Sequence, residues 1–229
     1  MIPRAPASLE EATDTKGLLL HALYAYDESR GRSQQKALGA SEIGGCRRRS
    51  FYRMVEYPEV NFVRKLAAAS GSAMHQRIED AFRFLDPKGE RFLPEVEVPG
   101  VLGMGPGHVD LVDLHLRKAS DWKTTKKKNL RYFPKTNQRW QVQIYGDLLV
   151  KAGYEIDTVE LVAIPLDGIE EDIRVHSEPR DPEVAAQAYA WLTGLHEMRD
   201  NGELPPAELS GRICEEYCPY FGPDSCGGK

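Results

Sequence analysis

The chain has 229 residues, of which 41% are hydrophobic and 28% are charged, and its formal net charge is −5. This length and composition fit one globular domain with a sizeable core, and they exclude a disordered tail protein and a fibrous repeat. No run approaches the roughly 18 consecutive apolar residues of a membrane helix, so we expect no membrane segment. The first residues turn acidic where a signal peptide would be apolar, so we expect a cytoplasmic protein.

The charge is unevenly distributed along the chain. Between Arg117 and Arg139 nine basic residues accompany a single acid, Asp121, so this segment carries +8 and the rest of the chain −13. Basic residues displace the counterions condensed on nucleic acid, so a basic segment on an acidic body is compatible with DNA binding. A solvated loop is the alternative that charge alone leaves open. Interleaved aromatic residues such as Trp122 and Trp140 suit base stacking and core packing equally.

Hydrophobic periodicity predicts helices first, then a β-meander, then alternating helices and strands. In chain order we expect a helix over Thr15–Glu28, a helix carrying Cys46 with Ser41 as its N-cap, a helix over Ala67–Leu85, strands over Arg91–Val98, His108–Leu116 and Ala119–Thr124, a helix over Gln138–Lys151 closed by Gly153, strands over Thr158–Pro165 and Glu171–His176, and a helix from Asp181 to about Arg199. No repeat or linker divides this order, which predicts one mixed α/β domain.

Two neighbouring predicted strands each present an acid. Asp110 lies in the sequence GHVDLVD, and Asp121 lies two residues before Lys123, so that these two share one face of their strand. A hairpin brings Asp110 beside Asp121, and clustered carboxylates are typical ligands of Mg²⁺ or Mn²⁺. Lys123 is placed to orient or help deprotonate a water next to a phosphate. The spacing alone is weak, and surface salt bridges are the alternative explanation.

Residue pairs on the flanking helices extend this set. His75 and Glu79 lie four residues apart and share a helix face, and His75 offers a nitrogen ligand that favours Mn²⁺. Gln141 and Tyr145 have the same spacing on the helix that follows the hairpin. Taken singly, His75 fits a structural role, and the glutamine–tyrosine pair fits an ordinary polar helix edge.

In combination these residues resemble the PD-(D/E)xK nuclease superfamily. The succession is His75 in Gly-x-x-x-His, Asp110 in GHVD, Asp121-Trp122-Lys123, and Gln141-x-x-x-Tyr145. Within the superfamily it is similar to the RecB-like branch, which includes the CRISPR-associated RecB-like exonucleases and the nuclease domain of AddB. The resemblance runs from about Ser41 to the C-terminus. It departs from the pattern at His108-Val109, which replaces a proline that many members also lack.

The resemblance implies a restriction-endonuclease-like α/β fold with a central mixed β-sheet flanked by helices. It implies that His75, Asp110 and Asp121 hold Mn²⁺ or Mg²⁺, and that Lys123 serves the attacking water. The glutamine–tyrosine pair is then expected to border the active site and to contact DNA.

The strand before Asp110 carries two further acids. Alternation places Glu95 and Glu97 on one face of this strand, and in related nucleases an acid here sometimes joins the metal site. Solvent exposure is the alternative. The sequence does not favour Glu95 over Glu97, and it leaves the role of Glu79 open.

The four cysteines are divided between the two ends of the chain. Cys46 stands alone, whereas Cys214, Cys218 and Cys226 follow the spacing C-x3-C-x7-C. In a cytoplasmic protein they are expected to bind metal rather than form disulfides. Zinc sites usually consist of two short pairs, whereas a one-plus-three arrangement suits a cubane cluster and resembles the iron–sulfur RecB-like nucleases. We expect a structural [4Fe–4S] cluster that staples the N- and C-terminal segments, with zinc and free thiols as alternatives.

These features predict a single nuclease domain over residues 1–229. Its expected parts are a helical N-terminal extension (1–40), the helix of the first cysteine (41–66), the nuclease core (67–180) and a C-terminal helix with the three-cysteine segment (181–229). The expected activity is that of a metal-dependent DNA exonuclease acting at DNA ends or in single strands, in recombination, replication or phage or CRISPR DNA processing. A non-catalytic DNA-binding or assembly module is the alternative. No motor ATPase loop occurs, so a helicase, recombinase or CRISPR integrase is the expected class of partner.

Overall fold

The computed structural model describes residues 14–29 and 37–228. Of the expected N-terminal extension it describes the helix α1 (Thr15–Ser29), while the acidic first residues lie outside the described ranges. None of the described helices combines the length and the apolar character needed to cross a membrane.

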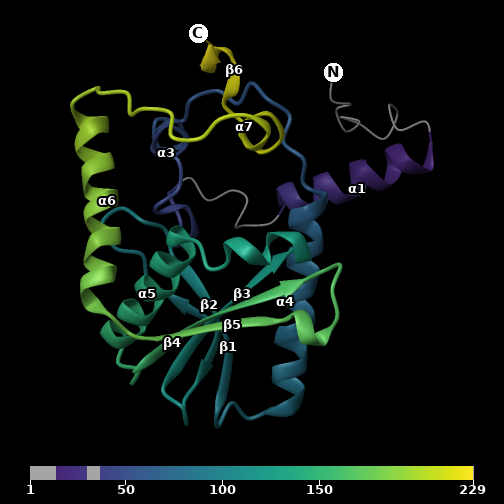
Figure 1. Cartoon of the computed structure of the whole chain (residues 1–229), viewed down its shortest axis with the longest axis vertical. Coiled ribbons are helices and arrows are strands. Elements are labelled where there is room, and N and C mark those ends of the chain that lie inside the picture. The colour runs from purple at the N-terminus through teal and green to yellow at the C-terminus, as the bar shows by residue number, and fades with distance from the viewer. Residues whose placement is uncertain (1–13, 30–36, 229) are drawn as a thin grey trace.

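A five-stranded mixed sheet forms the centre of the fold (Figure 1). Its strands lie in the order β1 (Phe92–Val98), β2 (Gly107–Asp113), β3 (Lys118–Thr125), β4 (Thr158–Pro165) and β5 (Arg174–Pro179). Only β3 and β4 are parallel among these neighbours. A parallel pair needs a crossover connection, which the helix α5 (Thr136–Lys151) supplies. The expected α/β fold with a central mixed sheet is therefore confirmed.

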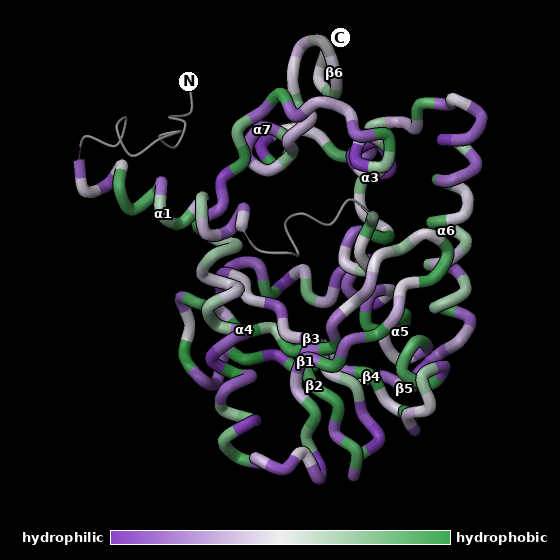
Figure 2. Tube along the Cα trace, turned by 180° about the vertical axis from the view of Figure 1, so that it is seen from behind, coloured by the Kyte–Doolittle hydropathy of each residue, from purple (hydrophilic) through white to green (hydrophobic). Residues whose placement is uncertain are grey.

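Helices α4 (Leu66–Leu85) and α5 cover opposite faces of the sheet. Phe82 of α4 stacks on Trp122 with the ring centroids 6.1 Å apart, whereas Gln141 of α5 hydrogen-bonds with Asp121. Side chains alternate along a strand, so positions 121 and 122 face opposite ways. Figures 1 and 2 both show the two helices on either side of the strands. Asp121 of β3 therefore faces α5.

The hydrophobic core lies between the sheet and the helices α5 and α6 (Pro182–Asp200). On β4 the fully buried Val159, Leu161 and Ala163 alternate with partly exposed residues. Figure 2 shows hydrophobic stretches along the central strands and α5. As expected, α6 begins after Asp181, whose side chain accepts hydrogen bonds from two backbone amides of the first turn.

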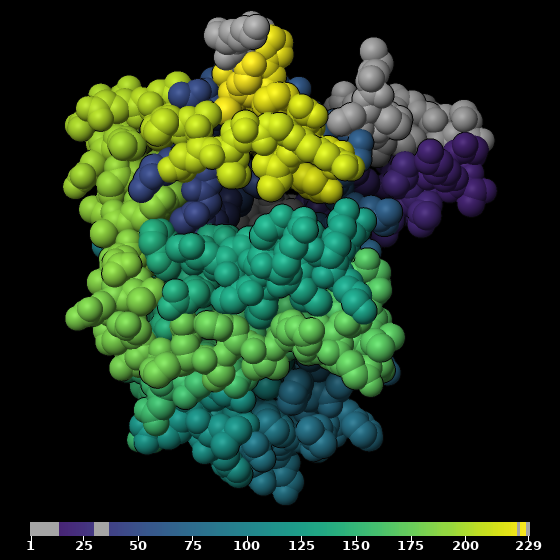
Figure 3. All heavy atoms as spheres, in the orientation of Figure 1, coloured from purple at the N-terminus to yellow at the C-terminus, as the bar shows by residue number. Residues whose placement is uncertain are grey.

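A cap of short elements joins the two cysteine-bearing parts of the chain (Figure 1). The helix α3 (Arg47–Met54) starts directly after Cys46, and α7 (Arg212–Tyr217) and β6 (Phe221–Gly228) carry two of the other cysteines. The Asn61 side chain donates a hydrogen bond to the Cys218 carbonyl at 2.9 Å. In Figure 3 the yellow C-terminal segment lies against the dark blue region of α3.

Three short 3₁₀ helices complete the described elements, η1 (Ala40–Glu42), η2 (Lys127–Tyr132) and η3 (Glu170–Asp172). The first of them corrects a prediction. Ser41 lies within η1 and is not the N-cap of the cysteine helix, because Cys46 occupies that cap position. Gly44, at a φ of +77°, ends η1 and separates it from α3.

Two strand predictions were also wrong at their boundaries. β2 ends at Asp113 and not at Leu116, because the Asp113 carboxylate accepts the backbone amides of His115 and Leu116 and so closes a turn. Leu116 is 55% exposed in that turn, although its apolar character extended the alternating pattern. β5 begins at Arg174, after η3, and runs to Pro179.

Candidate active site

The two predicted aspartates occupy adjacent strands. Leu111 pairs with Ser120 in the β2–β3 hairpin, and this register sets Asp110 beside Asp121. Both carboxylates are buried, at 8% and 2% exposure. The hairpin therefore brings the two acids together as the sequence predicted.

His75 of α4 reaches over to the first of these acids. Its Nδ1 lies 3.0 Å from Oδ1 of Asp110, and Oδ2 of Asp110 accepts the backbone N–H of Trp122 at 2.6 Å. Both oxygens of Asp110 are thus held by neighbours from different elements. His75 thus lies beside Asp110, the residue with which it is predicted to bind metal, whereas Glu79 is instead bound by Arg83 and Gln76.

Glu95 completes a three-residue group around these side chains. One ligand atom each of His75, Glu95 and Asp110 lies within 4.8 Å of the others. Glu95 adopts a φ of +54° in the middle of β1, a conformation that costs a non-glycine residue about 1–3 kcal/mol. By contrast, the Glu97 carboxylate is 69% exposed and lies 3.8 Å from Nε2 of His108. The structure therefore distinguishes Glu95 from Glu97, which sequence alternation did not.

A second group of side chains surrounds Asp121. The ammonium of Lys123 lies 2.6 Å from Oδ2 of Asp121 and donates a hydrogen bond to Oε1 of Gln141 at 2.7 Å. The amide nitrogen of Gln141 donates to Oδ1 of Asp121 at 3.0 Å and to the Tyr145 hydroxyl at 3.2 Å. One glutamine thus fixes both the lysine and the aspartate. The predicted partnership of Gln141 and Tyr145 on α5 is accordingly seen beside the acids.

Burial shapes the electrostatics of this site. Burial, together with the neighbouring Asp110 carboxylate, raises the pKa of Asp121 to about 6 despite the lowering effect of the Lys123 ammonium. For His75 the hydrogen bond with Asp110 raises the pKa, and it outweighs the lowering effect of burial. Crowded, buried carboxylates favour protonation unless a positive charge joins them.

The Lys123 ammonium forms an ion pair with Oδ2 of Asp121, which has no other partner among the described residues. One imidazole nitrogen and several carboxylate oxygens suit a hard divalent cation such as Mg²⁺ or Mn²⁺. His75, Glu95 and Asp110 form the closest donor set for it, and the predicted ligand Asp121 stands beside them.

The four cysteines converge in the cap. All four are buried and none forms a disulfide, and Cys214, Cys218 and Cys226 pack with Tyr52 and Tyr220 in one cluster. Burial raises the pKa of Cys214, and the other three thiols raise it further. Across the described chain, no three of these sulfurs lie within 4.8 Å of one another.

Internal ion pairs neutralise part of the positive charge of the basic segment, Arg117–Arg139. Lys118 pairs with Glu160, Lys127 with Asp172 and Arg139 with Glu178, at 2.8–2.9 Å. The positive charge that remains exposed is therefore smaller than the count of +8 suggested. Lys126 and Lys128 make no ion pair within the described ranges, and both are exposed.

The family model of the PD-(D/E)XK nuclease superfamily matches residues 2–222. The chain belongs to this superfamily. The match begins at residue 2 and so includes residues 2–40, which the motif resemblance leaves out. Among curated proteins none shows significant sequence similarity to this superfamily member.

Solved structures share the fold of this PD-(D/E)XK protein. SSO0001 is 18% identical, with a TM-score of 0.52 over 90% of this chain and 93% of that one. A phage-related exonuclease from Haemophilus somnus 129PT is 10% identical, with a TM-score of 0.51 over 72% and 94% of the two chains. The alkaline exonuclease LHK-Exo from Laribacter hongkongensis is 11% identical, with a TM-score of 0.51 over 75% and 91%. At these identities the likeness concerns the fold.

Proposed function

We propose that this chain is a Mg²⁺- or Mn²⁺-dependent DNA exonuclease that hydrolyses phosphodiester bonds at DNA ends or in single strands. The observation that carries the proposal is the convergence of His75, Glu95 and Asp110 beside the Asp121–Lys123 pair. In this proposal His75 and Asp110 hold the cation together with the acids at positions 95 and 121. Membership of a nuclease superfamily supports the same chemistry.

The cation, when bound, supplies positive charge that polarises the phosphate. Lys123 orients the attacking water and stabilises negative charge on the phosphate oxygens. Gln141 keeps the lysine ammonium in place by accepting its hydrogen bond, and Tyr145 in turn holds the glutamine amide. Attack of the water on phosphorus and departure of the sugar oxygen then break the phosphodiester bond.

Action at DNA ends is supported by the structures that share this fold. Two of them are exonucleases by name, and LHK-Exo has also been solved in complex with dAMP. Linear and covalently closed circular single strands of one sequence distinguish exonuclease from endonuclease action. We expect the linear strand to be degraded from an end and the circle to persist, whereas equal loss of both would contradict the exonuclease proposal. Blocking either end of the linear strand then gives the polarity.

We further propose that Cys46, Cys214, Cys218 and Cys226 hold a structural [4Fe–4S] cluster. Zinc sites usually consist of two short cysteine pairs. The arrangement of one cysteine far from three others supports the cluster over zinc, because a cubane takes one thiolate on each of its four irons. Its role is to join the two ends of the chain.

The cellular setting is part of the same proposal. We propose a cytoplasmic enzyme that acts with a helicase, a recombinase or a CRISPR integrase, because this chain carries no motor ATPase loop. A non-catalytic DNA-binding module remains the competing function, and nuclease activity that depends on Asp110 separates the two.

A further inference from the structure

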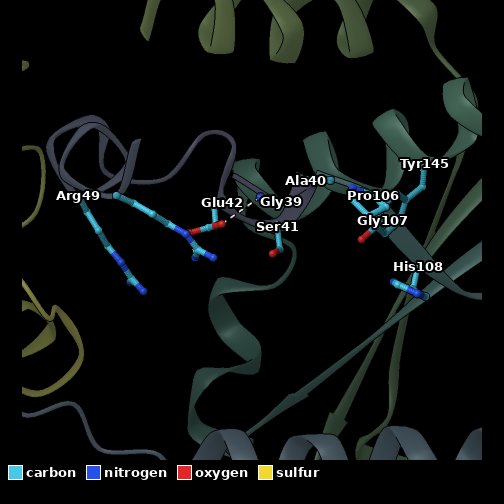
Figure 4. A pocket seen from close by; sticks show the side chains of 10 residues that line it. Gly39, Ala40, Ser41, Glu42, Arg49, Pro106, Gly107, His108 and Tyr145 are labelled. Carbon is cyan, nitrogen blue, oxygen red and sulfur yellow. Dashed lines mark hydrogen bonds and ion pairs between the residues drawn. The ribbon is translucent and has the colours of Figure 1, made fainter. Parts of the chain in front are cut away.

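A cavity of about 760 Å³ lies between the cap and the first turn of α5. Figure 3 shows the surface hollowed between the yellow C-terminal segment and the teal region below it. A smaller cavity of about 240 Å³ shares Ser41, Glu42 and Arg49 with it and extends to Tyr145 (Figure 4). The two cavities are therefore neighbours, and between them their linings reach from Tyr145 to Trp191.

Several polar groups that line the larger cavity lack partners. The Lys135 ammonium, the Asn137 amide and the Trp140 indole N–H make no side-chain hydrogen bond or ion pair with other described residues. The Arg49 guanidinium makes none either, although it interacts electrostatically with Cys218 and Tyr220. Figure 4 shows the Arg49 side chain extending from α3 into the open space of the smaller cavity. These four groups are hydrogen-bond donors, and two of them are cations.

The acids at the cavity are already neutralised. The Glu208 carboxylate forms an ion pair with the Arg47 guanidinium and accepts a hydrogen bond from the Arg47 backbone amide. Glu42 forms an ion pair with Arg53 at 2.7 Å. Among the ionisable side chains of the lining other than Cys46, the charge that remains unpaired is therefore positive. A negatively charged ligand that accepts hydrogen bonds fits such a lining.

The aromatic wall points to a ligand with a planar ring as well as a charge. Trp140 lines the cavity and passes close to Gly44, where a Cβ atom would come within 2.7 Å of its ring. A side chain at position 44 is disfavoured both by this close contact and by the backbone φ of +77°, which favours glycine. Phosphate charge beside an aromatic platform is the combination by which proteins bind single nucleic-acid strands.

We propose that this cavity binds one nucleotide of the single strand that enters the active site. Arg49 and Lys135 bind its phosphate, and the base lies against Trp140. Asn137 and Gln141 are four residues apart on α5, or about 6 Å along the helix axis, so a strand lying across Gln141 continues into the cavity. This inference rests on the proposed DNA substrate and adds a positioning subsite to it.

The test is binding of a short oligothymidylate to the full-length protein in the presence of a chelator, followed by tryptophan fluorescence. We expect Arg49→Gln and Lys135→Gln each to weaken binding. Each should also make the slope of log K against the logarithm of the salt concentration shallower by about 0.7, because one phosphate contact is lost. Trp140→Phe is expected to weaken binding about 5-fold or more. It should also remove much of the decrease in tryptophan fluorescence that accompanies binding. Lys88→Gln, an exposed lysine in the turn between α4 and β1, is the charge-matched control and keeps the wild-type slope. Arg49→Lys should restore the slope.

The possible failures can be told apart. If wild type binds and digests the oligonucleotide while Arg49→Gln and Lys135→Gln keep its salt slope, the subsite is wrong and the proposed function stands. If wild type neither binds nor digests it, the proposed function itself fails. Thermal unfolding shows whether each variant is folded. Should Trp140→Phe prove unfolded, the two charge variants decide.

Discussion

Nδ1 of His75 lies 3.0 Å from Oδ1 of Asp110, and this contact joins a helix and a strand across 35 positions of sequence. It links α4, on one face of the sheet, to the acids that face α5. Because Glu95 reaches the same place from β1, three elements contribute to one group of ligand atoms. The candidate metal site therefore depends on the fold as a whole.

The two glutamates of β1 give a matched test of the metal site. Glu95→Gln is expected to weaken Mn²⁺ binding about 10- to 100-fold, by analogy with the loss of groups that support metal ligands. Glu97→Gln removes the same charge from an exposed position and is expected to leave the affinity unchanged. Titration calorimetry of Mn²⁺ into the metal-free protein measures both. Equal Mn²⁺ affinities of the two variants would show that Glu95 is not a ligand of the metal.

Lys123 is expected to act in the reaction and not in holding the metal. Lys123→Met should lower kcat about 10²- to 10⁴-fold, the usual contribution of a positioned acid–base group, while Mn²⁺ affinity is retained or increased. Single-turnover digestion of labelled DNA at saturating metal gives the rate, and calorimetry gives the affinity. A variant that lost metal binding but recovered full activity at high Mn²⁺ would contradict this role.

Gln141 is expected to position Lys123 and Asp121. Gln141→Ala should lower kcat about 10- to 100-fold with little change in KM, because the amide contacts both side chains. Gln141→Glu keeps an acceptor for Lys123 but replaces the donor to Asp121 with a second carboxylate, so it should not recover the rate. A loss of protein stability with an unchanged kcat would show a purely structural role.

Asp113 is expected to stabilise the β2–β3 turn in a pH-dependent way. Burial alone would raise its pKa, but the Arg91 guanidinium and the amides of Leu116 and His115 hold it below the usual range. Asp113→Asn should therefore lower the free energy of unfolding at neutral pH by about 1–2 kcal/mol, which allows for the partly exposed arginine.

The pH dependence of that difference follows from the lowered pKa. A carboxylate with a depressed folded-state pKa stabilises the protein above its unfolded value of about 3.9 and loses this effect as the pH falls below it. Denaturant unfolding of wild type and Asp113→Asn at neutral and acidic pH measures the difference between their free energies of unfolding. We expect this difference to disappear in acid. A difference that does not depend on pH would argue against the ion pair as its cause.

The cysteine site makes a prediction about metal content. Protein purified without oxygen should be coloured and contain iron and sulfide, and Cys46→Ser should lose most of both and unfold at a lower temperature. In the proposed cluster Cys46 is the ligand from the N-terminal side, so its loss would break the link between the two ends of the chain. A colourless wild-type protein that contains zinc and no iron would contradict the cluster.

The sequence predicted the strands and helices that carry the candidate site residues. Each of them has a hydrophobic or polar pattern that depends only on residues close together in the sequence. Alternation identified the strands of Asp110 and Asp121, and the i, i+4 spacing placed Gln141 and Tyr145 on one helix face. Each of these inferences needs only the geometry of a single element or one hairpin.

What the sequence missed depends on backbone geometry and on distant partners. Glu95 and Glu97 are equivalent under alternation, and the positive φ that sets Glu95 apart is not encoded in a period of two. Pro94 within the strand was the one local sign of irregularity. Likewise, Glu208 binds Arg47 across 161 positions, which no local pattern reveals.

Digestion of labelled linear single-stranded DNA with Mn²⁺, by wild type and by Asp110→Asn, tests the central claim most directly. We predict degradation by the wild-type protein that a chelator abolishes, and at least about a 100-fold lower rate for Asp110→Asn. Thermal unfolding should show that the variant remains folded. Equal background rates for the two proteins would contradict the assignment of a nuclease active site.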